Sequence, residues 1–175
     1  MMENTNTAGK IFQISVSPTR GKCPAGEKIG AQSQQEGKIP VLSCEGACIR
    51  GEIARLAANR VGKAPGYQRG CHGELFTVPD AKISHWILDA DKVVCIDGCF
   101  LKCHSRILKN MIAPAKLEVF DALSYYKKYS DLFDIDDVPE AERKQTAEEV
   151  AGWVLKSLAD NKTENPVANN SSCGA

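Results

Sequence analysis

Short apolar runs alternate with amphipathic segments through the middle of the chain. Residues 38–44, 91–97 and 116–122 are brief, mainly apolar runs of the kind that forms buried strands. Between them, residues 47–61 and 79–90 carry apolar side chains at intervals of three and four, which is the spacing of one helix face. The pattern therefore predicts strands and helices in alternation.

Two further helices are predicted after the second and third of these strands. The segment 99–112 places four side chains in one stripe, and the stripe predicts the buried face of a helix: Phe100, Cys103, Ile107 and Met111. The segment 138–160 is the longest predicted helix, with an inner face of Ala147, Val150, Ala151, Val154 and Leu158. Residues 63–71 are irregular and leave room for only a very short strand before Cys71.

The two ends of the chain differ in character from the middle. Residues 1–37 are interpreted as an N-terminal extension, with a short strand at 10–17 and a long loop rich in Gly, Pro and Gln at 18–37. Residues 38–160 form the predicted α/β domain. Residues 161–175 are too polar to bury an apolar face, so we expect a disordered tail that includes Cys173.

Alternation of strands and helices indicates the fold class. It predicts a three-layer α/β fold with a mostly parallel sheet and helices on both faces. Right-handed crossovers bring the carboxyl ends of parallel strands to one edge of the sheet. Ligands of such folds bind at this edge.

Composition limits the classes of function. Lys plus Arg and Asp plus Glu are both 22, so the formal net charge is zero, whereas nucleic-acid binders carry a positive surface. No apolar run approaches the roughly 20 residues of a membrane span, and the first residues lack a signal-peptide pattern. We therefore expect a cytoplasmic protein with neither nucleic acid nor membrane as partner. In that compartment eight cysteines are expected to be reduced, as metal ligands or reactive thiols.

Three cysteines recur at the interval of one strand-plus-helix unit. Cys44, Cys71 and Cys99 are separated by 27 and 28 residues, and a unit of this kind spans about 30. Each follows the end of a predicted strand, so the fold should gather them at one edge. Cys103 is predicted one helical turn beyond Cys99, and Cys48 has the same spacing from Cys44.

Such a cluster suits a metal ion. Zinc takes four ligands in a tetrahedron, and thiolates are among its preferred ligands. Helix N-termini that begin at the cysteines would stabilise the thiolates, and Gly46 and Gly98 would let backbone amides approach sulfur. We expect a metal ion as partner, with zinc bound by Cys44, Cys71 and Cys99 together with Cys103. Two alternatives stay open: an iron–sulfur cluster on the same cysteines, and a thiol-based redox or sulfur-handling enzyme with Cys99 as nucleophile and Cys103 as resolving thiol.

The other cysteines and histidines near these positions have several interpretations. Cys95 lies within a strand and is interpreted as core filling. Cys48 is interpreted either as a ligand, additional or in replacement, or as filler. Cys23 is interpreted as a free thiol. His72 and His104 each follow a candidate ligand and are interpreted as surface groups or as groups behind the ligands.

Two segments resemble a known family. The stretch "VVCIDGCFLKC", which begins at Val93, resembles the signature of the DGC-domain family, named after its Asp-Gly-Cys motif and regarded as zinc-binding. The upstream stretch "VLSCEGACIRGEIARLAANRV" resembles the opening strand, cysteine turn and helix of that family, and the similarity runs from Lys38 to Asp121.

The resemblance implies four metal-binding cysteines. They correspond here to Cys44, Cys71, Cys99 and Cys103. The chain departs from the family pattern in its N-terminal extension with Cys23, and in the cysteines at 48 and 95. The extra thiols leave room for a different set of ligands or a different metal.

Overall fold

The protein folds around one parallel sheet. The computed structural model describes residues 13–163. Its four strands are β1 (Ile39–Ser43), β2 (Tyr67–Arg69), β3 (Val93–Asp97) and β4 (Leu117–Asp121), in the spatial order β2-β1-β3-β4. All three pairings are parallel, with Val41 opposite Val94 and Cys95 opposite Val119.

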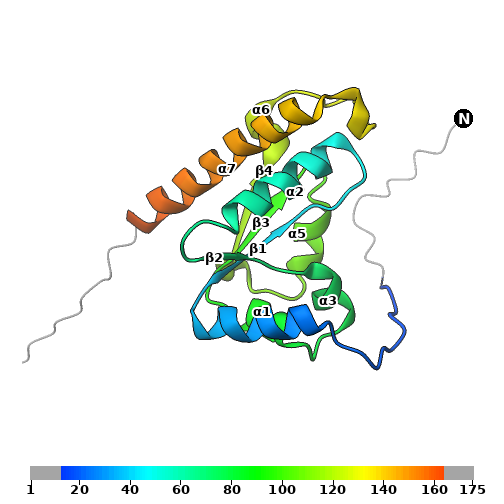
Figure 1. The fold of residues 1–175 in the computed structure, drawn as a ribbon, viewed down its shortest axis with the longest axis vertical. Coiled ribbons are helices and arrows are strands. Elements are labelled where there is room, and N and C mark those ends of the chain that lie inside the picture. The colour runs from blue at the N-terminus through cyan, green and yellow to red at the C-terminus, as the bar shows by residue number, and fades with distance from the viewer. Residues whose placement is uncertain (1–12, 164–175) are drawn as a thin grey trace, which may run out of the picture.

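Helices cover both faces of the sheet (Figure 1). On one face, α2 (Ile49–Val61) runs beside α7 (Glu140–Thr163), and α6 (Ala122–Tyr126) joins them in one apolar core. The other face is covered by α3 (His72–Thr77), α4 (Lys82–Asp89) and α5 (Cys103–Leu108), with α1 (Pro24–Gln35) packed on α4.

The strands divide their side chains between these two cores. Val94 and Ile96 point to the α2 and α7 side, whereas Val93 and Cys95 point to the α4 side, and all four are fully buried. This arrangement confirms the predicted three-layer α/β fold. Cys95 packs within the second core, in agreement with its interpretation as core filling.

The strand order creates a switch point between β1 and β3. From β1 the chain passes through α2 to β2 on one side, and then crosses to β3 on the other. Crevices at such points, beyond the carboxyl ends of the strands, are the usual ligand sites of open α/β sheets. Cys44, Cys71 and Cys99 all follow strands that meet there.

Residues 18–37 were predicted as a loop, and that prediction is wrong. Residues 24–35 form helix α1, which begins with Pro24 in its first turn. Its buried positions are Gly26, Gly30 and Ser33, so the buried face carries no apolar side chains that a periodic pattern would reveal. The small face permits close packing, since a Cβ on Gly30 would lie 2.3 Å from the backbone nitrogen of Ile83.

The helix predicted at 99–112 is shorter and turned differently. It covers only Cys103–Leu108, and Lys102 before it adopts a left-handed backbone with φ of 50°. The predicted stripe is exposed, with Phe100 at 72% and Ile107 at 45%. Leu108 and Ile112 are buried instead, because the turn before the helix resets which face meets the sheet.

Other differences lie at the ends of the chain. Residues 13–17 form no strand, and residues 10–12 of that predicted strand lie outside the described part. The very short strand before Cys71 is confirmed as β2, whereas helix α3 after it was not predicted. Helix α7 buries its predicted inner face and runs to Thr163, three residues into the predicted tail. The rest of that tail, with Cys173, lies outside the described residues, and the predicted domain boundaries stay predictions.

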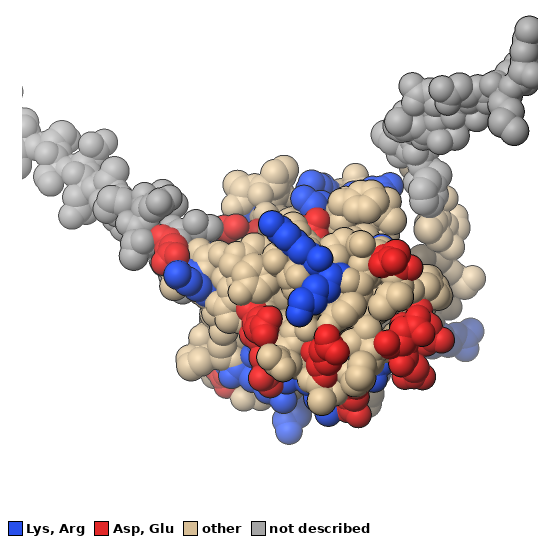
Figure 2. Space-filling view, turned by 90° about the horizontal axis from the view of Figure 1, so that it is seen from above, with Lys and Arg blue, Asp and Glu red and all other residues tan. Residues whose placement is uncertain are grey.

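The surface mixes charges of both signs. Seen from above, basic and acidic side chains are interspersed with wide uncharged areas (Figure 2). Among the described residues, no helix has the length and apolar character needed to cross a membrane.

Candidate metal centre

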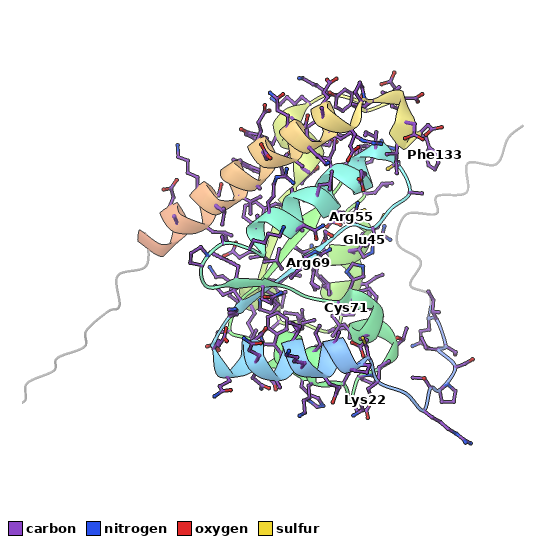
Figure 3. All side chains as sticks on the ribbon, viewed as in Figure 1. Lys22, Glu45, Arg55, Arg69, Cys71 and Phe133 are labelled. Atoms are coloured by element: carbon purple, nitrogen blue, oxygen red, sulfur yellow. The ribbon has the colours of Figure 1, made fainter. Side chains whose placement is uncertain are left out.

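Three of the four predicted ligands lie at the carboxyl ends of adjacent strands. Cys44 directly follows β1, and Cys71 and Cys99 each come two residues after the ends of β2 and β3. Cys103 is the first residue of α5. Figure 3 shows Cys71 at this edge together with Glu45 and Arg69. The prediction that the cysteines gather at one edge of the sheet is confirmed at the level of the strand ends.

Cys44 is the innermost of the four. Its side chain is 8% exposed, and its sulfur accepts a hydrogen bond from the Gly46 amide at 3.4 Å. Burial raises the pKa of the Cys44 thiol, while the Gly46 and Gly98 amides oppose this effect, and the nearby Asp97 and Cys103 act with burial. The thiol is therefore protonated at neutral pH, and a metal ion that bound it would displace the proton.

The loop after β2 meets the loop after β3 through two histidines. His72 follows Cys71 and His104 follows Cys103, and their ring centroids are 4.6 Å apart with planes inclined by 53°. Burial, helped by the charges of His104 and Arg69, lowers the pKa of His72 to about 4. Burial also lowers the pKa of His104, against the opposing effect of Asp97. Both imidazoles are therefore neutral at pH 7.

Cys48 and Cys99 share a different neighbour, Arg50. Cys48 is the N-cap of α2 and is partly buried. Burial alone would raise the pKa of its thiol, but hydrogen bonds from the Gly51 amide and the Arg50 side chain outweigh burial and lower it. The Cys48 and Cys99 sulfurs both lie close enough to Arg50 to raise the pKa of its guanidinium. Cys48 is thus favoured as a thiolate in the absence of metal.

Asp97 explains the first residue of the Asp-Gly-Cys motif. Its carboxylate is fully buried and accepts hydrogen bonds from the backbone amides of His104 at 3.2 Å and Ser105 at 3.4 Å. These amides belong to the first turn of α5, where they lack partners within the helix. The carboxylate therefore fixes the start of α5 and with it the position of Cys103.

Arg69 organises the same edge, and the sequence did not single it out. Its guanidinium donates to the hydroxyl of Ser43 at 2.5 Å, to the carboxylate of Glu45 at 2.6 Å and to the carbonyl of Val41 at 2.8 Å. These bonds tie the end of β2 to the end of β1. The signal was an arginine at the end of a strand, directly before the "GC" at residues 70–71.

The cysteines approach one another in pairs. Cys44 and Cys103 are within electrostatic range of each other, and Cys48 and Cys99 both interact with Arg50. Cys99 lies in the turn before α5, so Cys99 and Cys103 are not one helical turn apart as predicted. Among the described residues, no group of three or more His, Cys, Asp or Glu side chains is already positioned to hold a metal ion.

Comparison with known protein families matches the DGC domain over residues 40–150, well over half of the chain. The chain belongs to the DGC domain family. The match confirms the resemblance drawn from the sequence, and it includes every cysteine of the sheet edge, whereas Cys23 and Cys173 lie outside it. No curated protein and no solved structure shows significant similarity to the chain.

Proposed function

We propose that this DGC-domain protein is a cytoplasmic zinc-binding protein whose ligands are Cys44, Cys71, Cys99 and Cys103. The observation that carries the proposal is their position beyond the ends of three adjacent parallel strands. All seven cysteines in the described part of the chain are free, as expected where thiols are kept reduced.

The chemistry of the donors fits a zinc ion. Thiolates are preferred zinc ligands, and the Gly46 amide already donates to the sulfur of Cys44. Cys71 and Cys103 are exposed, so their side chains are free to turn towards a metal ion without disturbing a packed core. Cys48 is the natural additional or replacement ligand, because it shares Arg50 with Cys99.

A bound zinc ion would hold the three loops together and, with water in place of one sulfur, would supply a Lewis acid. The residues around it have separate tasks. Arg69 and Glu45 fix the ends of β1 and β2, and Asp97 fixes the start of α5.

Elemental analysis tests this proposal. We expect about one zinc ion per chain in protein purified under native conditions without chelator, because one tetrahedral site takes four sulfurs. Iron with matching sulfide would replace zinc by an iron–sulfur cluster on the same edge. Protein that is folded, reduced and free of metal, and that takes up none when zinc is added, would contradict the proposal.

A second candidate function, thiol chemistry, is favoured by the lowered pKa of one cysteine. The thiolate is the reactive form of cysteine, and Cys48 is the residue whose pKa is lowered by Arg50 and Gly51. A thiol-based redox or sulfur-handling enzyme built on this edge would therefore use Cys48 as nucleophile, in place of the Cys99 expected from the sequence.

Alkylation of the zinc-free, reduced protein tests this candidate. At pH 7 we expect iodoacetamide to label Cys48 before the more exposed Cys23, and Arg50→Met to slow the labelling of Cys48 several-fold. Arg55→Met is the matched control, because Arg55 lies on the same helix but pairs with Glu52. Equal labelling rates for Cys48 in both variants would remove the reason for this candidate.

A further inference from the structure

His72 and His104 form a contact that neither the fold nor the four cysteines require. His72 opens α3 and His104 lies in the first turn of α5, so the two side chains come from loops on either side of the β1 end. Their rings nevertheless lie with centroids 4.6 Å apart. Two histidines from different loops are thus held together over the switch point of the sheet.

Both imidazoles have an unused ring nitrogen. The Nδ1 atoms of His72 and His104 are buried and have no hydrogen-bond partner within the described residues. A buried polar atom without a partner costs free energy, and nearly all such atoms in folded proteins are paired with protein or ordered water. Two unpaired nitrogens on rings in contact indicate a shared partner that the polypeptide does not supply.

The charge around the pair admits a cation. The nearest anionic groups are the buried Asp97, whose carboxylate accepts from the His104 amide, and Glu45. The nearest cation, Arg69, is bound to Glu45 and Ser43, which offsets its charge. A cation at the histidines would therefore meet a compensated surrounding.

We propose that His72 and His104 form a second metal site, which takes a borderline divalent ion of the zinc class through imidazole nitrogen. Neutral imidazole is a preferred ligand of such ions. Two nitrogens on one zinc ion lie about 3.4 Å apart, since each Zn–N bond is about 2.0–2.1 Å. Rings in contact reach that separation through small side-chain rotations. Water completes the shell, and this site is separate from the four-cysteine site.

Zinc binding by the intact reduced protein tests the second site. In equilibrium dialysis we expect a weaker zinc equivalent beyond the one assigned to the cysteines, with affinity lowered at least tenfold in His72→Gln and in His104→Gln. The chain has three histidines, and the third provides the control: His85→Gln on α4 should keep the full binding. A second equivalent that survives in both variants, or none in the wild type, would overturn the proposal.

Two measurements on wild-type protein do not depend on how the variants fold. Nitrogen-15 NMR of the imidazoles should show zinc-induced shifts of Nδ1 in two of the three histidines, His72 and His104. X-ray absorption should show that the second equivalent adds nitrogen neighbours at about 2.0–2.1 Å and no sulfur at about 2.3 Å. Unshifted imidazoles would overturn the histidine site alone. A first equivalent without sulfur neighbours would instead contradict the four-cysteine site.

Discussion

Replacing Gly98 by alanine is expected to destabilise the protein by about 3 kcal/mol, at the upper end of the usual cost of overpacking. A Cβ on Gly98 would lie 2.8 Å from the backbone carbon and oxygen of Arg50 and 3.0 Å from the nitrogen of Gly51. These are backbone atoms of the first turn of α2, so they cannot swing aside as a side chain can. Either α2 or the loop after β3 must shift.

The same shift would disturb the candidate metal centre. Gly98 stands directly before Cys99, and its amide approaches the Cys44 sulfur and opposes the rise in that thiol's pKa. We therefore expect Gly98→Ala to lower zinc occupancy as well as the melting temperature, the latter by roughly 6–12 °C. Gly98→Val should be worse on both counts, because a β-branched side chain is larger and stiffer.

A second glycine provides the matched control. Gly152 lies on the exposed side of α7, and a Cβ there would meet no atom within 4 Å. Gly152→Ala should therefore raise stability by about 0.5–1 kcal/mol through helix propensity and leave the zinc content unchanged. If Gly98→Ala were as stable as the wild type, close packing between α2 and the Asp-Gly-Cys turn would not be the reason for glycine at 98.

Much of the fold follows from local patterns. The strands at 39–43 and 93–97 are short apolar runs, and helix α7 has a regular apolar face, so each announces itself within one window of sequence. Helix α1 does not, because its buried face is made of Gly26, Gly30 and Ser33. Close packing on α4 replaces apolar area there, and that packing is visible only when both helices are in place.

The candidate site divides in the same way. Strand spacing alone placed Cys44, Cys71 and Cys99 at one edge, because parallel crossovers impose that geometry. The partners of these residues were not predictable. Arg50 beside Cys48 and the contact of His72 with His104 depend on how separate loops meet across β1, and nothing in the spacing of one segment encodes that meeting.

Serine replacements of the predicted ligands should have the other large effect. We expect Cys44→Ser, Cys71→Ser, Cys99→Ser and Cys103→Ser each to lose most of the bound zinc. Metal that binds only the folded state at 1,000 times its Kd stabilises that state by about 4 kcal/mol. Its loss should lower the melting temperature by roughly 8–16 °C, as measured by calorimetry beside elemental analysis.

Two cysteines separate loss of metal from loss of a thiol. Cys23→Ser should change neither quantity, because this thiol is exposed and lies before α1, away from the strand ends. Cys95→Val should keep the zinc and cost less than about 1.5 kcal/mol, because valine has a similar volume and the site is apolar and fully buried. A large loss of zinc in Cys95→Val would place the ligands inside the sheet instead of at its edge.

Cys48→Ser decides the ligand set. The four-cysteine site predicts that this variant keeps its zinc, since the role of Cys48 would then be that of a neighbouring thiolate beside Arg50. If zinc is lost, Cys48 is a ligand and one of the four is not, and the exposed Cys71 after the three-residue strand β2 is the first to be reassigned. Retention of zinc in all four single variants, together with its loss in none of the others, would end the proposal of a shared cysteine site.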